Sequence, residues 1–188
     1  MSSPRNAADW MGEHVRAMPK AVRIGFALRK GVMPPSADLA VDDNQAVWTS
    51  RRSVRAFHDS KELFPAERTA LDRYGKAIKS ARVLDIGIGK GRTTGHLAGV
   101  SAQYTGIDYS SEMVRCAKAR FPDVDLRVMD ARDLSIFSSA SFEIAIFSSN
   151  GTDYAGHADR LLILREIHRV LVQGGVLLFS SHNRNSPI

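Results

Sequence analysis

Four places along the chain put polar side chains directly after short apolar runs, and three of them carry an aspartate. Asp85 opens the glycine-containing run Asp85-Ile86-Gly87-Ile88-Gly89-Lys90-Gly91, and Asp108, Asp130 and Ser148-Ser149-Asn150 follow later runs. In an open parallel sheet, ligands bind outside the carboxyl ends of the strands. The sequence therefore predicts a ligand site where these three carboxylates and the polar cluster share one edge.

The residues in and around the glycine run indicate which class of ligand the site favours. Gly87, Gly89 and Gly91 permit positive φ and a close approach of backbone N–H groups, and the following helix N-terminus adds positive potential. Such a loop alone suits any nucleotide. A dinucleotide pattern counted from Gly87 needs a small residue where Arg92 stands, and Asp85 would be a poor neighbour for phosphates. The loop thus favours a cationic ligand over NAD.

The other two aspartates have positions suited to a nucleoside. Asp108 lies where a carboxylate accepts hydrogen bonds from both ribose hydroxyls, although it could also act as an acid at a helix N-terminus. Asp130 could accept the exocyclic amino group of an adenine, or could be a plain turn residue. Together with Asp85 they describe an adenosine that carries a positive group and no phosphate.

The elements that must position these residues begin at residue 82. From there, short apolar runs alternate with helical stretches, as in a parallel sheet covered by helices. We expect strands at 82–86, 104–108, 125–129, 143–147 and 175–180, and helices at 93–98, 111–120 and 159–171. The last helix should bury Leu161, Leu164, Ile167, Val170 and Leu171 and should end at Gly174-Gly175.

Before the first strand we expect a helix over 65–79, with Ala70, Leu71, Tyr74 and Ile78 as its buried stripe. Residues 1–62 are assigned to an N-terminal extension that is basic and partly helical, with one helix at 19–30. Residues 63–188 are assigned to the core domain.

Length, charge and cysteine content limit the domain number, the compartment and the partners that we expect. The chain has 188 residues, a net charge of +6 and one cysteine, Cys116. This length suits one domain, and a single cysteine agrees with a reducing compartment. The basic excess lies before residue 83 without a nucleic-acid-binding signature, so a solvated face is favoured over nucleic acid. We expect no transmembrane segment, a cytoplasmic location and no metal site.

These motifs resemble those of the class I S-adenosylmethionine-dependent methyltransferases. Residues 83–94 look like the first motif of that family, Gly106-Ile107-Asp108-Tyr109-Ser110 like its ribose motif, and Asp130-Ala131 like its adenine motif. Residues 147–154 and 165–175 resemble its fourth-strand end and the helix before its fifth strand. The resemblance implies a Rossmann-like three-layer α/β sandwich with a mostly parallel sheet, S-adenosylmethionine as cofactor and S-adenosylhomocysteine as product.

The resemblance also implies roles for individual residues. The methionine part of the cofactor would be held by Asp85, Ile86, Gly87, Gly89, Gly91 and Thr93; the ribose and adenine by Asp108, Tyr109, Met113, Asp130 and Ala131; and the sulfonium side by Ser148 and Asn150. Three positions depart from the usual pattern, which are Lys90, Glu143 and Val172-Gln173.

Catalysis by methyl transfer needs alignment and a dry site, and no universal nucleophile. If the acceptor must lose a proton, a base helps, and the candidates are His157, Asp153, Tyr154 and His182. Residues that could close the cofactor site from ahead of the first strand are Trp48, Arg51, Arg52, Arg55 and Tyr74. The acceptor is expected to be a small molecule, and no feature selects the methylated atom.

The family's sheet has two further strands after the fifth, and we expect residues 1–188 to lack this C-terminal strand pair. Val176 to Phe179 should then form an apolar edge that invites pairing. Three alternatives follow: a fragment of a longer protein, an edge covered by a homodimer partner or the N-terminal segment, or a methyltransferase-like binding module without catalysis. An NAD-dependent oxidoreductase is the least favoured class.

Overall fold

The structure is a computed structural model, and it describes residues 62–182 together with Thr49 and Val54. The predicted helix at 19–30 and four of the proposed site-closing residues, Trp48, Arg51, Arg52 and Arg55, lie outside the described residues.

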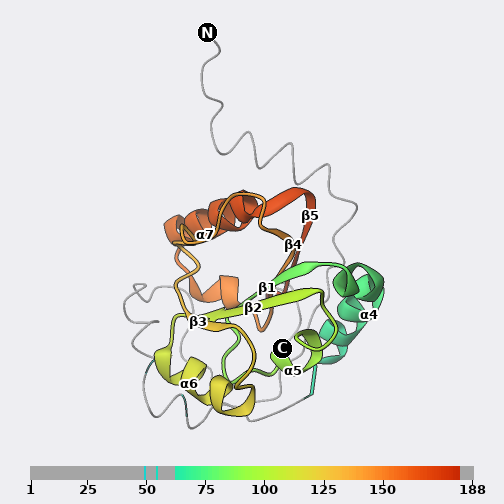
Figure 1. Cartoon of the computed structure of the whole chain (residues 1–188). Coiled ribbons are helices and arrows are strands. Elements are labelled where there is room, and N and C mark those ends of the chain that lie inside the picture. The colour runs from blue at the N-terminus through green and yellow to red at the C-terminus, as the bar shows by residue number, and fades with distance from the viewer. Residues whose placement is uncertain (1–48, 50–53, 55–61, 183–188) are drawn as a thin grey trace.

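Five strands form one sheet in the part of the chain that the structure describes. They are β1 (Arg82–Ile86), β2 (Gln103–Asp108), β3 (Leu126–Val128), β4 (Phe142–Phe147) and β5 (Leu171–Phe179). The strand order is β3-β2-β1-β4-β5, and every neighbouring pair runs parallel (Figure 1). The predicted parallel α/β architecture is confirmed.

Helices cover both faces of this sheet. The elements are α4 (Pro65–Lys79), α5 (Thr94–Leu97), α6 (Ser111–Arg120), the 3-10 helix η1 (Gly151–Tyr154) and α7 (His157–Val170). Buried residues of α7 pack with Leu84 and Ile107 on one face, while α4, α5 and α6 pack against Val83 and Ile144 on the other. Successive strand residues point to opposite faces, which produces the three layers.

Helix α4 begins and ends where its sequence favours it. Pro65 occupies the first turn, and a carboxylate oxygen of Glu67 accepts the N–H of Phe64 at 2.9 Å. Lys76 and Lys79 lie in the last turn, where positive charge complements the helix dipole. The predicted buried stripe is largely right, since Ile78 is buried and Leu71 and Tyr74 pack against the core.

The boundary between α7 and β5 differs from the prediction. The last helix ends at Val170, one residue before the predicted end, but β5 begins at Leu171 and not at Gly175, because Leu171 already pairs with Phe142. Residues 172–175 of β5 then form an irregularity opposite Glu143, with Gly174 at φ 79°. Regular pairing resumes at Val176, so the glycines act as a bulge within a strand and not as a helix stop.

Glu143 also has a structural role. Its carboxylate accepts the backbone N–H of Arg82 at 2.7 Å and the Arg82 guanidinium at 2.6 Å. This pair joins β4 to β1 at the amino-terminal edge of the sheet, away from the predicted ligand edge.

Ile107 is fully buried near the carboxyl end of β2, whereas Ile136 is 66% exposed in a loop. We expect Ile107→Ala to lower the free energy of unfolding by about 2–5 kcal/mol, because it removes buried methyl groups and leaves a cavity. The matched variant Ile136→Ala should change it by less than about 0.5 kcal/mol. Urea denaturation of both variants provides the measurement, and equal effects would contradict the described core.

Candidate functional site

The carboxyl ends of the strands bring the predicted residues to one edge. β1 lies between β2 and β4, so the chain leaves β1 toward one side of the sheet and later returns on the other. Ligands bind at such a switch point in open α/β sheets. Asp85 and its glycines, Asp108 and Ser148 therefore come from three adjacent strands, and Asp130 follows β3 at the outer end.

The glycine loop depends on backbone conformations that other residues rarely adopt. Gly87, Gly89 and Gly91 have φ values of 70°, 54° and 84°. A Cβ atom on Gly91 would also lie 2.8 Å from Cε2 of Phe121. The loop is held against β2 by the N–H of Gly87, which donates to the carbonyl of Ile107 at 2.8 Å.

Asp85 is completely buried at the start of this loop. Its Oδ2 atom accepts hydrogen bonds from the Thr93 hydroxyl at 2.6 Å and the Tyr104 hydroxyl at 2.7 Å, while Oδ1 has no hydrogen-bond partner. Burial raises the pKa of Asp85 to about 6, against the opposing effects of these two hydroxyls and of Arg92. A buried acceptor without a partner is costly, and it marks a place where a donor or cation is favoured.

Tyr104 is a site residue that sequence reasoning missed. Its ring lies in the core on the same face of the sheet as Val83, and its hydroxyl contacts both Asp85 and Thr94. Gly106 makes this contact possible, because a Cβ there would lie 3.0 Å from the Tyr104 hydroxyl. Asp85 pairs with Gly106, two residues after Tyr104, so the strand register reveals that Tyr104 lies near Asp85. The sequence alone does not give this register.

Asp108 fixes the second part of the edge. Its Oδ2 accepts the N–H of Gly89 at 2.9 Å, and its Oδ1 accepts the N–H of Ser110 at 2.8 Å. Burial raises the pKa of Asp108, and these two backbone hydrogen bonds oppose the rise. A carboxylate offers about four acceptor positions, so Asp108 holds the glycine loop and still has capacity for further donors.

Tyr109 and Met113 follow directly after Asp108. Met113 is buried in the first turn of α6, where its N–H donates to the Ser110 hydroxyl. Tyr109 is half-buried, and burial raises its pKa, with smaller contributions from Asp108, Asp130 and Tyr154. The Tyr109 hydroxyl therefore lies within electrostatic range of both predicted adenosine acids and of η1.

Asp130 has a partner that the sequence did not predict. Arg132 donates to Oδ2 from its side chain at 2.6 Å and to Oδ1 from its backbone N–H at 2.8 Å. The pair is about one-third exposed, and Arg132 also reaches Asp159. The neighbouring Ala131 is buried in the core. Any ligand that uses Asp130 as an acceptor must share it with Arg132.

The segment after β4 is strained and closely packed. Ser149 and Asn150 both have φ of 57°, in the left-handed region that non-glycine residues seldom occupy. Ser148 is buried. The ring of Phe147 lies between two glycines, because a Cβ on Gly87 would be 3.1 Å and a Cβ on Gly151 2.0 Å from its Cε2 atom. This ring connects the glycine loop to η1.

The base candidates fall into two groups. His157 is exposed at the first position of α7, and Tyr154 is half-buried at the end of η1, where burial raises its pKa. Asp153 and His182 contact each other directly, with Oδ2 of Asp153 2.7 Å from Nδ1 of His182. On the other side of the ring, Nε2 of His182 lies 3.2 Å from Nδ2 of Asn150. The structure thus joins a predicted cofactor residue to two base candidates.

Arg92 has a role beyond excluding a dinucleotide. Its side chain is 10% exposed, and its guanidinium forms a bidentate pair with Glu67, with one bond at 2.7 Å. The guanidinium also donates to the Ser149 hydroxyl at 2.5 Å. It lies 4.5 Å from the centre of the Phe64 ring. This single side chain ties the start of α4 to the glycine loop and to the strained segment after β4.

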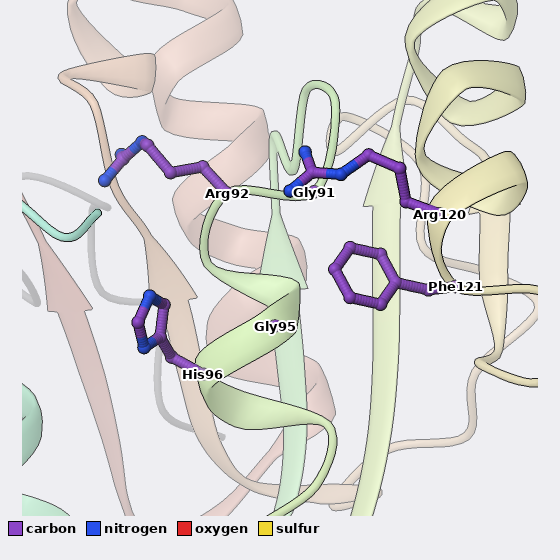
Figure 2. Close-up of a pocket in the computed structure, with 6 residues that line it drawn as sticks. All are labelled: Gly91, Arg92, Gly95, His96, Arg120 and Phe121. Atoms are coloured by element: carbon purple, nitrogen blue, oxygen red, sulfur yellow. The ribbon is translucent and has the colours of Figure 1, made fainter. Parts of the chain in front are cut away.

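The back of the glycine loop borders a separate cavity of about 440 Å³. Its lining residues are Gly91, Arg92, Gly95, His96, Arg120 and Phe121 (Figure 2). Arg120 donates to the carbonyl of Lys90 at 2.6 Å, and Phe121 packs toward Gly95. The cavity includes only Gly91 among the predicted cofactor residues, so it is distinct from the edge where the aspartates lie.

Comparison with known proteins agrees with this geometry. Residues 83–175 match the sequence model of a methyltransferase domain family. These residues form a domain of the class I S-adenosylmethionine-dependent methyltransferase type. That family uses S-adenosylmethionine as its methyl donor. The matched residues include the glycine loop and end within the irregular part of β5.

Two relatives define the methyltransferase likeness further. A ubiquinone biosynthesis O-methyltransferase of Xanthomonas campestris is 34% identical over 112 residues, which cover 57% of this chain and 46% of that protein. A probable S-adenosylmethionine-dependent methyltransferase of Mycolicibacterium smegmatis is 27% identical over 136 residues, which cover 72% of this chain and 51% of that protein. The chain spans about half the length of the curated relatives that it matches.

Solved structures of methyltransferases share the fold. A SAM-dependent methyltransferase from Methanosarcina mazei superimposes with a TM-score of 0.52 at 28% identity, covering 63% of this chain and 57% of that one. Phosphoethanolamine N-methyltransferase 1 of Haemonchus contortus, solved with phosphoethanolamine and S-adenosylhomocysteine, superimposes with a TM-score of 0.56 at 17% identity, covering 74% and 31%. Among residues 62–182, no helix has the length and apolarity needed to cross a membrane.

The raised pKa of Asp85 predicts a specific pH dependence of stability. Between pH 3.8 and about 6 the folded state keeps the proton that the unfolded state has lost, so raising the pH should destabilise the fold. Above pH 6 the penalty is constant and on the order of 3 kcal/mol. Asp85→Asn cannot ionise, so the difference in free energy of unfolding between this variant and the parent chain should grow from pH 4 to pH 6. A flat difference in urea denaturation would contradict the burial of an ionisable Asp85.

The Arg92–Glu67 pair gives a second stability prediction. Glu67→Gln leaves a buried guanidinium without its countercharge and should lower the free energy of unfolding by about 3–5 kcal/mol. Glu112→Gln breaks a bidentate pair with Arg115, whose side chain is 68% exposed, and should cost less than about 1 kcal/mol. Thermal and urea denaturation of both variants measure the contrast. Similar values for the two would show that Arg92 is solvated.

Proposed function

We propose that this chain binds S-adenosylmethionine at the carboxyl edge of β1, β2 and β4 and transfers its methyl group to a small-molecule acceptor. The observation that carries this proposal is the buried Asp85, whose Oδ1 lacks a partner beside a loop of three left-handed glycines. Such a loop brings backbone N–H groups close to a ligand, while Asp85 favours a cation.

The residues present fit the cofactor. Asp108 has acceptor capacity left after binding Gly89 and Ser110, as two ribose hydroxyls require. Tyr109 and Met113 offer an apolar surface next to Asp108, and Asp130 and Ala131 lie beyond them at the same edge. We assign the methionine part to the loop residues Asp85, Ile86, Gly87, Gly89, Gly91 and Thr93, and the sulfonium side to Ser148 and Asn150.

The protein's part in the reaction is alignment. S-adenosylmethionine, when bound, supplies an electrophilic methyl group on a positively charged sulfur. Thr93 and Tyr104 hold Asp85 in one orientation, and Arg92 holds the glycine loop and Ser149 together. Fixed geometry of this kind accelerates an in-line displacement by removing the entropy of bringing two reactants together.

We infer that the methylated atom is an oxygen. The curated relatives at 33–34% identity are named as O-methyltransferases. The N-methyltransferase structure, at 17% identity, supports the fold alone. The competing function is a methyltransferase-like binding module, which would bind cofactor without turnover.

Isothermal titration calorimetry tests the cofactor assignment. S-adenosylmethionine and S-adenosylhomocysteine should bind, and NAD should not, because the loop lacks the third glycine position and carries Asp85. Asp108→Asn should weaken S-adenosylhomocysteine binding by about 10-fold or more, since an amide nitrogen replaces one acceptor and opposes a backbone N–H. Asp123→Asn, at an exposed turn, is the matched control and should leave affinity unchanged. Indifference to all three ligands would refute the proposal.

A further inference from the structure

A chain of three polar side chains crosses from η1 to the segment after β5. The carboxylate of Asp153 faces Nδ1 of His182 at 2.7 Å, and Nε2 of the same ring faces the side-chain nitrogen of Asn150 at 3.2 Å. We call this the Asp153–His182–Asn150 chain. It lies at the carboxyl ends of β4 and β5, the edge that holds the glycine loop.

The hydrogen bonds of this chain fix the tautomer of His182. A carboxylate can only accept, so Nδ1 of the ring must carry the hydrogen that faces Asp153. In a neutral imidazole, Nε2 is then an acceptor, and the Asn150 amide donates to its lone pair. A histidine whose second nitrogen is oriented by a carboxylate is arranged to take up a proton at the first.

Asp153 is itself firmly held. Its Oδ2 also accepts the backbone N–H of His182 at 2.7 Å, and its Oδ1 accepts the Ser181 hydroxyl at 2.8 Å. The N–H of Asn150 donates to the Ser180 hydroxyl at 2.8 Å, which fixes the other end of the chain. The ring cannot rotate without breaking both ends, so Nε2 keeps one direction.

The position of the chain suits an acceptor site. His182 retains 34% of its side-chain exposure and Asp153 22%, so a small molecule can reach the ring. The Phe147 ring packs between Gly87 of the glycine loop and Gly151, the first residue of η1, which also carries Asp153.

We propose that His182 is the general base that takes the proton from an acceptor hydroxyl, with Asp153 as its positioning residue. This inference rests on the proposed methyltransferase function. The hydroxyl proton passes to Nε2 and displaces the weak Asn150 contact. The oxygen electron pair forms the new bond to the methyl carbon, while the carbon–sulfur bond breaks and its electrons stay on sulfur. The proton on His182 then passes to water.

The test uses the full chain with S-adenosylmethionine and two probe acceptors, catechol and 4-nitrophenol, at pH 8. Catechol needs a base at this pH, whereas 4-nitrophenol is already ionised. His182→Ala should lower kcat/KM for catechol by about 100-fold or more, and far less for 4-nitrophenol. His168→Ala, in the last turn of α7 at the opposite edge, is the matched control and should leave both rates unchanged.

Asp153 is tested by a readout that a purely structural role would not change. Asp153→Asn should lower kcat for catechol and leave KM and S-adenosylhomocysteine affinity unchanged, and Asp153→Glu should restore part of the loss. Nitrogen-15 NMR of the His182 ring should show the Nδ1–H tautomer in the parent chain and a mixture in Asp153→Asn. This measurement needs no acceptor.

Several results would overturn the inference. These are an Nε2–H tautomer at His182, equal losses for both phenols, and loss of activity in His157→Ala with retention in His182→Ala. Failure to methylate either phenol by a chain that binds S-adenosylhomocysteine would also overturn it and leave the cofactor site standing. Absence of cofactor binding would instead refute the proposed function.

Discussion

A carboxyl group without contact to water, Asp85, stands at the end of the central strand and constrains the residues around it. Burying a charge is expensive unless it is hydrogen-bonded. Here the hydroxyls of Thr93 and Tyr104 both donate to Oδ2 of Asp85, while Oδ1 has no hydrogen-bond partner. A Cβ atom on Gly106 would lie 2.7 Å from Cδ2 of Leu126 and 3.0 Å from the Tyr104 hydroxyl, so a side chain there would disturb the Tyr104–Asp85 contact. The ribose motif therefore serves the neighbouring strand as well as its own aspartate.

The glycine loop that follows Asp85 is held by contacts to several other elements. A loop of glycines with positive φ loses more conformational entropy on folding than other residues do. Contacts to other elements offset this entropy loss. Asp108 accepts the N–H of Gly89, and Arg120 donates to the carbonyl of Lys90. Arg92 bridges to Glu67 and Ser149. The position of Lys90, unusual for the family, is accommodated because only its backbone is used in that contact.

The edge divides into two halves with different chemistry. On the β2 and β3 side, carboxylates and Tyr109 make an acidic and partly apolar surface suited to an adenosine. On the β4 and β5 side, strained backbone at Ser149 and Asn150 precedes a polar chain in which His182 lies between Asn150 and Asp153. Strain of this kind persists only where the surroundings fix it, and it is common at functional sites. The Phe147 ring links the two halves.

The sequence alone determined the strand and helix alternation, the single edge and the residues Asp85, Asp108 and Asp130, because hydrophobic period and glycine spacing are local signals. It also placed α4 to the residue, since Pro65, Glu67 and the terminal lysines mark its ends. It misjudged β5, where the glycines form a bulge that depends on pairing with β4. Tyr104, the Arg92–Glu67 pair, the Arg132 partner of Asp130 and the order Asp153–His182–Asn150 were decided only by the tertiary structure. These contacts join residues 2 to 32 positions apart, and the Arg82–Glu143 pair joins residues 61 positions apart, in ways that strand register and packing determine. No local pattern encodes which side chains meet across such distances.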